Sequence, residues 1–288
     1  MKKIRKAVIP AAGTGTRFLP ATKAQPKEML PIVDKPVIQY VVEECVASGI
    51  EDIIIVNGWH KRSIEDHFDY PFELEKRLEQ AGKLKELDEI RKIAAMANFV
   101  YIRQKGPYGN ATPVINAQHI IGDEPFVVVW GDEFFQAQPP RIKQCIEVYE
   151  EYGNPVIAGM KLTKEEVVKY GCPEVEEVAP SIYNIKRVIE KPTVEEAPSE
   201  FAITGCYLLT PEFFPILNNL PLGKSNELWL TDALDVYSKT KTINLKVIDG
   251  KYHDCGNKLS FLKANIAIAL EQKDIADALK AYIRSLNI

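Results

Sequence analysis

The sequence predicts an α/β fold in which helices flank a doubly wound, mainly parallel sheet. Short runs that are apolar throughout recur at residues 7–12, 53–56 and 126–130, a pattern typical of central strands that helices cover on both faces. A glycine-rich loop at 13–16 ends the first run, and apolar residues then recur at helical spacing over 37–48. Strand, loop and helix in this order indicate that a ligand would lie at the carboxyl ends of the strands.

The other elements follow the same periodicity. Residues 73–97 carry apolar side chains at helical spacing, which predicts one or two amphipathic surface helices broken near Gly82. We expect them to dock on the core, with a subunit contact as the alternative. Residues 155–198 are less regular and predict a small additional β region of short strands and turns, and a helix starting near Lys258 closes the chain. No repeat or low-complexity linker interrupts the sequence, so one domain is expected.

Composition limits the classes of partner. The 288 residues are 46% hydrophobic, enough for a large core, and a net charge of -4 gives no general attraction to nucleic acid or anionic lipid. The five cysteines are scattered without zinc-site spacing, which favours reduced thiols in a cytoplasmic protein. The basic start of the chain runs into an apolar stretch too short for an export signal, and no stretch approaches the roughly 20 apolar residues of a membrane span. A small anion is therefore the expected ligand.

The glycine loop after the first strand is the strongest local motif. Glycines here let backbone N–H groups approach phosphate oxygens, and Arg17 and Lys27 add positive charge at the same place. A dinucleotide fingerprint would need a third glycine where Phe18 stands, and a P-loop would need Gly-Lys-Ser or Gly-Lys-Thr. Three nearby prolines also forbid a long helix directly after the loop. The loop therefore predicts a triphosphate cradle, formed by Ala11, Ala12, Gly13, Gly15 and Thr16.

The segment KAQPKEMLP at 23–31 resembles the signature of sugar-phosphate nucleotidyltransferases in its uridylyltransferase version. Further matches follow in the family's order over most of residues 1–265: DKP at 34–36, IQYVV at 38–42, IEDHFD at 64–69, EKP at 190–192, LTDA at 230–233 and HDCGNK at 253–258. The resemblance implies a Rossmann-like fold of the nucleotide-diphospho-sugar transferase type. It also implies a single domain over 1–288, with a nucleotide-binding part at 1–135, a sugar-binding part at 136–257 and a C-terminal helical segment at 258–288.

The activity that the resemblance implies is Mg²⁺-dependent transfer of UMP from UTP to α-D-glucose 1-phosphate, which gives UDP-glucose and pyrophosphate. The same reaction with dTTP or another sugar 1-phosphate is one alternative. A non-catalytic sugar-nucleotide sensor or scaffold is another, and the retained Arg17, Lys27, Asp132 and Lys191 argue against it. The resemblance also implies a homodimer or homotetramer.

Carboxylates at two positions are candidate metal ligands. Asp132 follows an apolar strand, which places it at the carboxyl end of the sheet beside the expected cleft. Mg²⁺ takes a few carboxylates together with phosphate oxygens and water. The resemblance makes Asp132 a ligand and Asp254 the second one; a loop-capping role is the alternative for each.

The family pattern also assigns the two substrate sides. Gln104 and Glu28 are the candidates for the uracil edge, beside Gly109, and Gly171 and Gly205 are glycines near the sugar. Glu190 would accept hydrogen bonds from sugar hydroxyls and Lys191 would reach the sugar phosphate; a surface ion pair is the alternative for these two. Because Pro192 favours an extended backbone, we expect the two neighbours to point to opposite faces and not to serve one atom.

The chain departs from the family pattern around the expected cleft. Residues 108–113 read YGNATP where the pattern has a second glycine and a histidine, and Trp130-Gly131-Asp132 replaces a more usual Leu-Pro-Asp. Residues 57–60 read NGWH in place of a small polar stretch, and Cys206 stands where arginine is common. These changes leave the phosphate and metal residues in place and bear on the choice of sugar and, less strongly, of base.

Overall fold

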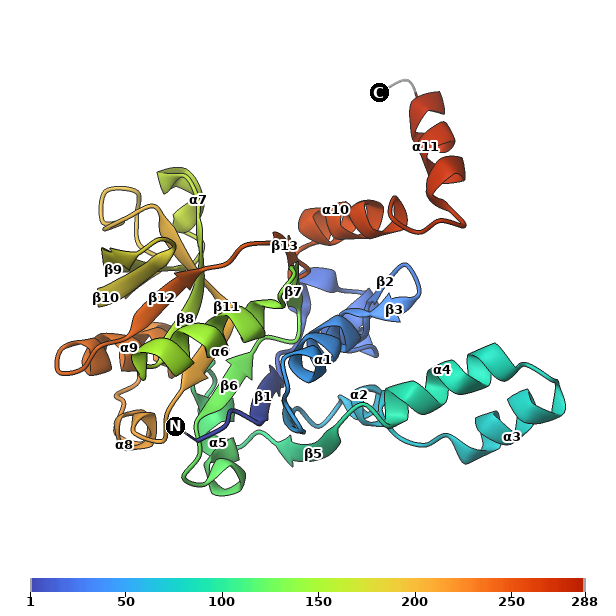
Figure 1. The fold of residues 1–288 in the computed structure, drawn as a ribbon, viewed down its shortest axis with the longest axis horizontal. Helices are drawn as coiled ribbons and strands as arrows, with labels where there is room; N and C mark the ends of the chain where they lie inside the picture. The colour runs from blue at the N-terminus through green and yellow to red at the C-terminus, as the bar shows by residue number, and fades with distance from the viewer. Residues whose placement is uncertain (1, 287–288) are drawn as a thin grey trace.

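A nine-stranded sheet forms the centre of the computed structural model, which describes residues 2–286 (Figure 1). The strands run in the order β5-β4-β1-β6-β11-β8-β12-β10-β9. Their bounds are β1 (Lys6–Ala11), β4 (Asp52–Asn57), β5 (Asn98–Arg103), β6 (Phe126–Val129), β8 (Val156–Lys161), β9 (Gly171–Ala179), β10 (Ile182–Glu190), β11 (Phe201–Leu209) and β12 (Asn244–Val247).

Half of the sheet is the parallel, doubly wound part that the sequence predicts. β5, β4, β1 and β6 pair in parallel, whereas β11 lies antiparallel between β6 and β8. The region 155–198 is more regular than expected, because β9 and β10 are nine-residue antiparallel strands that continue the same sheet at its far edge. Buried residues in β10 are separated by pairs of partly or fully exposed ones, which is why no continuous apolar run marked this strand.

Helices cover both faces of the sheet, as apolar strands of this kind require. Val8 packs into the core on one face and Ile9 into the core on the other, following the two-residue period of a strand. One face is covered by α1 (Val37–Ala47) and α6 (Arg141–Tyr152). The other is covered by α5 (Thr112–Ile121), α8 (Phe213–Leu217) and α9 (Leu230–Ser238).

Two short ribbons lie beyond the main sheet. One pairs β2 (Pro31–Ile32) with β3 (Lys35–Pro36), and the other pairs β7 (Glu133–Gln136) with β13 (Lys251–Asp254). In the second ribbon Asp254 pairs with Glu133, so that a late segment of the chain lies beside the residue after Asp132. Two further short helices, α2 (Arg62–His67) and α7 (Lys164–Val167), complete this part of the fold.

Two helical arms extend from this body (Figure 1). The first is the pair α3 (Phe72–Gln80) and α4 (Leu84–Ala94), which are separate helices with the break near Gly82 that the sequence predicts. Docking of both on the core was the wrong expectation: α3 has no buried residue, and Phe72 is 81% exposed. The second arm is α10 (Lys258–Ala269) followed by α11 (Ala276–Ser285); residues 287 and 288 of the expected helical segment lie outside the described residues. Among residues 2–286, no helix is long and apolar enough to cross a membrane.

Candidate active site

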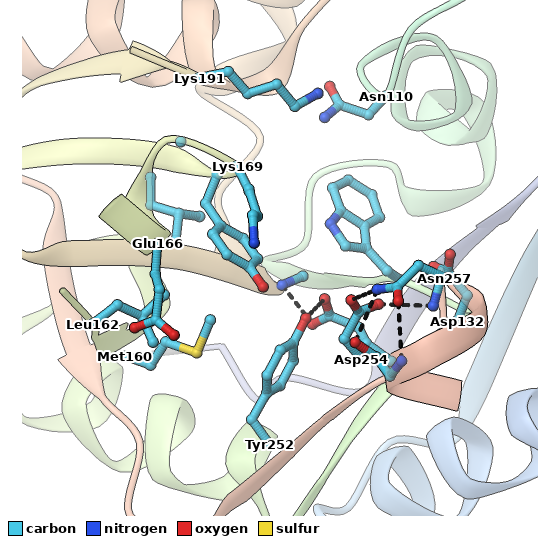
Figure 2. A pocket seen from close by; sticks show the side chains of 18 of the residues that line it. Asn110, Asp132, Met160, Leu162, Glu166, Lys169, Lys191, Tyr252, Asp254 and Asn257 are labelled. Carbon is cyan, nitrogen blue, oxygen red and sulfur yellow. Dashed lines mark hydrogen bonds between the residues drawn. The ribbon is translucent and has the colours of Figure 1, made fainter. Parts of the chain in front are cut away.

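Two cavities open side by side beyond the carboxyl ends of β1 and β6. The larger cavity has a volume of about 770 Å³ and the smaller one about 420 Å³. Asn110, Trp130 and Asp132 line both, so the two cavities meet at these side chains. Figure 2 shows Asp132, Asp254 and Asn257 together on one side of a pocket, with Lys191 and Asn110 facing each other across its opposite end.

The glycine loop lies between strand β1 and three single-turn helices. These turns are η1 (Thr16–Phe18), η2 (Ala21–Lys23) and η3 (Lys27–Met29), and they replace the long helix that the three prolines exclude. Gly15 has φ of 67°, a left-handed conformation that glycine adopts without strain, and the Thr22 hydroxyl donates to its carbonyl.

The predicted cradle residues divide into lining and supporting positions. Ala12, Gly13 and Lys27 line the smaller cavity, and Arg17 lines the larger one. By contrast, Ala11 is buried in the core, and Gly15 and Thr16 line neither cavity. We therefore interpret these three residues as shaping the loop.

Charged groups converge where the cavities meet. Lys27 Nζ donates to Asp132 Oδ2 over 2.6 Å. A Cβ atom placed on Gly256 would lie 3.1 Å from Asp254 Oδ1, 3.2 Å from Asp132 Oδ2 and 3.8 Å from Arg17 Nη1. Gly256 therefore leaves open a space that both carboxylates and a guanidinium border. The structure thus brings together residues that are more than a hundred positions apart in the sequence.

The opposite charges in this cluster stabilise one another's ionised forms. Burial works against ionisation of Asp132, but the Lys27 and Arg17 charges outweigh it and lower the pKa of this carboxyl. Burial likewise opposes the charge on Lys27, yet Asp132 and Glu28 raise the pKa of the amine. Both groups are therefore ionised at neutral pH.

The donor set at this position fits Mg²⁺. Within residues 2–286, no three His, Cys, Asp or Glu side chains gather as a metal site, so a cage made only of protein ligands is not present in that range. Asp132 and Asp254 instead present two carboxylates, which are hard oxygen donors, beside an open cavity, and Asp254 is oriented by the backbone N–H of Gly256 and the amide of Asn257. A few carboxylates combined with phosphate oxygens and water are the set that Mg²⁺ prefers.

Glu28 lies at the inner wall of the smaller cavity. It is 1% exposed, and its Oε2 accepts a hydrogen bond from Lys61, which is 0% exposed, over 2.8 Å. Its Oε1 is buried and has no hydrogen-bond partner among residues 2–286. Burial raises the pKa of Glu28, and the Lys61 charge opposes that shift. A buried acceptor without a partner is uncommon and indicates a place for a ligand donor. Lys61 was not singled out in the sequence, because one lysine in a polar stretch carries no pattern.

The loop carrying Gln104 and Gly109 forms the outer wall of the smaller cavity. Gly109 has φ of 122°, and a Cβ atom there would lie 2.1 Å from the carbonyl oxygen of Leu228. Backbone hydrogen bonds join Leu228 to Tyr108 and to Ala111. Pro113 lies in the first turn of α5, where the missing N–H has no intrahelical partner to lose. The altered YGNATP sequence thus forms a closed loop held by the segment before α9.

Glu190 and Lys191 both line the larger cavity, which corrects the expectation that they face opposite ways. β10 ends at Glu190, and Lys191 takes φ of 45°, so the chain leaves the extended conformation at that residue. The two side chains form an ion pair with an N–O distance of 3.3 Å, and the Lys191 amine also lies 4.8 Å from the centre of the Trp229 ring. A positive φ outside glycine is strained and is found preferentially at functional sites.

Gly171 and Gly205 line the same cavity, and each glycine is also required by neighbours within the chain. A Cβ atom on Gly171 would lie 2.8 Å from Thr231 Cγ2, and one on Gly205 would lie 1.9 Å from Trp130 Cδ1. The N–H of Gly205 donates to Glu133, so this donor is already used. Trp130 itself stacks obliquely on Tyr207 with ring centres 5.2 Å apart, and it forms a wall between the two cavities.

A family model described as nucleotidyl transferase matches residues 6–271, and the chain belongs to this family. It is therefore a nucleotidyltransferase, and the resemblance predicted from the motifs is confirmed. The UTP–glucose-1-phosphate uridylyltransferase YngB of Bacillus subtilis is 48% identical over 285 residues, which cover 99% of this chain and 96% of the relative. The UTP–glucose-1-phosphate uridylyltransferase of Staphylococcus epidermidis is 46% identical over 288 residues and 100% of both chains.

Solved structures agree with these relatives. A UDP-glucose pyrophosphorylase complexed with UDP-glucose matches with a TM-score of 0.86 and 41% identity over 94% of this chain and 100% of that chain. The UTP-bound enzyme from Acinetobacter baumannii matches with a TM-score of 0.91 and 36% identity over 99% and 100%. The predicted fold of the nucleotide-diphospho-sugar transferase type is confirmed.

Proposed function

We propose that this chain transfers UMP from UTP to α-D-glucose 1-phosphate, giving UDP-glucose and pyrophosphate. The observation that carries the proposal is the meeting of two cavities at Asp132, where Lys27, Arg17 and Asp254 also converge. A nucleotidyl transfer needs two anionic substrates joined at one phosphorus, and this arrangement offers a cavity for each. The names of the similar proteins, and the UTP and UDP-glucose bound to the solved ones, support the same reaction.

We assign UTP to the smaller cavity. Its walls carry the glycine loop, Glu28 and Gln104. Uracil presents an N–H between two carbonyl oxygens, and the free Oε1 of Glu28 together with the Gln104 amide can supply an acceptor and a donor. The sugar phosphate then belongs to the larger cavity, with Glu190 for sugar hydroxyls and Lys191 for the phosphate.

The chain's own residues bring the reacting atoms together. The sugar phosphate is an anion at neutral pH, so its oxygen can attack the α-phosphorus of UTP in line without a protein nucleophile. The bond to the β-phosphate oxygen breaks and pyrophosphate leaves. Arg17, Lys27 and Lys191 hold the phosphates in place and offset their negative charge, and such positioning can supply most of the rate enhancement. Mg²⁺ held by Asp132 and Asp254 would further neutralise the phosphate oxygens.

The test is a substrate panel read by pyrophosphate release. UTP and dTTP are each combined with glucose 1-phosphate, and the better triphosphate is then offered several sugar 1-phosphates, with and without EDTA. UTP with glucose 1-phosphate should be preferred at least about tenfold, a difference within reach of one or two contacts, and EDTA should abolish turnover. Asp132→Asn should lower turnover at least about 100-fold with an unchanged fold. A tenfold preference for dTTP or for another sugar phosphate would overturn the substrate assignment.

We further propose a cytoplasmic homodimer or homotetramer. The five buried free cysteines suit a reducing compartment. Exposed apolar residues on the second arm, Leu262, Ile266 and Tyr282 among them, support contact with another copy. Light scattering should give two or four times the mass of one chain, and a monomer at micromolar concentration would contradict this.

A further inference from the structure

An arginine is completely buried behind the larger cavity. Arg141, the first residue of α6, is 0% exposed. Its Nε and Nη2 donate to the two carboxylate oxygens of Glu44 on α1, over 3.1 and 3.0 Å. Its Nη1 donates to Glu133 Oε1 over 2.8 Å. The planar guanidinium thus joins two buried carboxylates that a lysine could not bridge with the same geometry.

Glu133 joins three segments that border the candidate active site. Its Oε1 accepts from the N–H of Gly205 on β11 over 2.7 Å, and its Oε2 accepts from the hydroxyl of Tyr252 on β13 over 2.7 Å. Glu133 itself begins β7, directly after Asp132, and pairs with Asp254 across the ribbon. One carboxylate therefore ties the sugar-side wall to both candidate metal ligands.

We propose that Arg141 is a positioning residue for the sugar-phosphate side of the reaction. By holding Glu133 against Gly205 and Tyr252, it sets the distance between the sugar-side wall and the Asp132–Asp254 pair. Arg141 does not line either cavity, so it acts only through Glu133. The walls of the smaller cavity away from Asp132 depend on other contacts, those of Glu28 with Lys61 and of Gly109 with Leu228. This inference rests on the proposed assignment of the two cavities.

The position of Cys206 offers a direct way to replace the guanidinium. Cys206 follows Gly205 on β11, is 0% exposed, and lies close enough to Arg141 and Glu44 for their charges to act on its thiol. It is also the position at which the family pattern has arginine. A guanidinium introduced there would come from β11, which packs against α6. Cys206→Arg would therefore offer a guanidinium from β11 in place of the one that Arg141 supplies from α6.

The experiment compares four variants with the parent enzyme: Arg141→Lys, Arg141→Leu, the double variant Arg141→Leu/Cys206→Arg, and Arg5→Leu. Arg5 is the matched control, because it makes two contacts with the Glu124 carboxylate near the amino ends of β1 and β6. Each variant is assayed for KM of both substrates, for kcat and for its urea midpoint. The parent enzyme is measured first with UTP and glucose 1-phosphate, so that an error in the proposed substrates is recognised before the variants are compared. Any better acceptor found in the panel then replaces glucose 1-phosphate in every comparison.

Arg141→Lys and Arg141→Leu should lower kcat/KM for glucose 1-phosphate by about 10-fold to 100-fold while KM for UTP stays within about threefold, since a small misplacement of a reacting group has effects of this size. The double variant should recover most of this loss, and Arg5→Leu should change only the urea midpoint. If Arg141→Leu does not fold, the kinetics of Arg141→Lys and of the double variant still test the proposal. Parent-like kinetics of Arg141→Lys would overturn the proposal. An equal rise in KM for both substrates, or a folded double variant that recovers none of the lost kcat/KM for glucose 1-phosphate, would do the same.

Discussion

The backbone conformation at single residues determines which side chains reach each of the two cavities. Lys191 reaches the larger cavity only because its backbone turns to φ of 45°, and Lys27 reaches the smaller one from a single helical turn. Sequence neighbours on a strand would have pointed apart, so the position of Lys191 follows from local conformation and not from residue spacing. The two amines consequently belong to opposite sides of Asp132.

Lys191→Ala should therefore raise KM for glucose 1-phosphate, whereas Lys27→Ala should impair the use of UTP. Each loss should be about 10-fold to 100-fold, because a charge-assisted contact to phosphate contributes about 1.5–3 kcal/mol. Steady-state kinetics with each substrate varied in turn provide the measurement. A variant of Lys191 that changed only KM for UTP would show that the cavity assignment is wrong.

The buried pair of Lys61 and Glu28 leads to a stability prediction. Lys61→Met would leave Glu28 buried without its hydrogen-bonded charge partner, and the loss of one partner of such a pair costs about 3–5 kcal/mol of unfolding free energy. The double variant Lys61→Met/Glu28→Gln should recover much of this loss, since the uncompensated charge is removed. Urea unfolding of the two variants gives the comparison. Equal destabilisation in both would mean that packing, and not charge, accounts for the effect.

At the scale of elements, the smaller cavity is built by two segments that hold each other. The loop before α5 and the segment before α9 exchange backbone hydrogen bonds at Leu228, and Asn110 Oδ1 accepts from the N–H of Leu230 at the start of α9. This last contact satisfies one of the free N–H groups at a helix N-terminus. The shape of the nucleotide side thus depends on both segments together.

Gly109→Ala should push the loop before α5 away from Leu228, because the added methyl group would lie 2.1 Å from the Leu228 carbonyl oxygen. Since the loop is at the surface, the fold should survive, and KM for UTP should rise at least about 10-fold with a smaller effect on glucose 1-phosphate. Gly82→Ala on the first arm is the matched control, since Gly82 also has positive φ and its added methyl group would contact nothing within 4 Å. Parent-like KM for UTP in Gly109→Ala would contradict the assignment of this loop.

At the scale of the whole molecule, titration of buried groups couples folding to pH. Burial lowers the pKa of His67, whose ring also shares a hydrogen bond of 2.9 Å with Gln39. Below pH 6.5, the ordinary value for histidine, the unfolded chain binds a proton that the folded chain resists. Stability therefore falls as the pH drops through and below 6.5, until the lowered folded-state pKa is passed.

His67→Gln should make this decline shallower. The measurement is the urea midpoint at several pH values between about 7.5 and 5. The exposed His119, on α5, provides the control substitution to glutamine. An unchanged slope in His67→Gln would mean that other groups govern stability in this range.

Several strands, the glycine loop and one helix of this protein follow from residues that are close together in the sequence. The apolar runs of β1, β4 and β6, the glycine loop and the spacing of α1 follow from local periodicity and from the conformational limits of glycine and proline. The signature motifs are also local, so the family was predictable from them. The predicted candidates Asp132, Lys27, Glu190 and Lys191 do line the two cavities.

The tertiary structure alone decided which distant residues meet. Arg141 joins Glu44 and Glu133, Lys61 joins Glu28, and the ribbon of β7 and β13 brings Asp132 beside Asp254. These contacts depend on the order of strands in the sheet, and the last also on the pairing of β7 with β13. Local periodicity cannot encode them, because it reports which face of an element is apolar and not which element packs against that face.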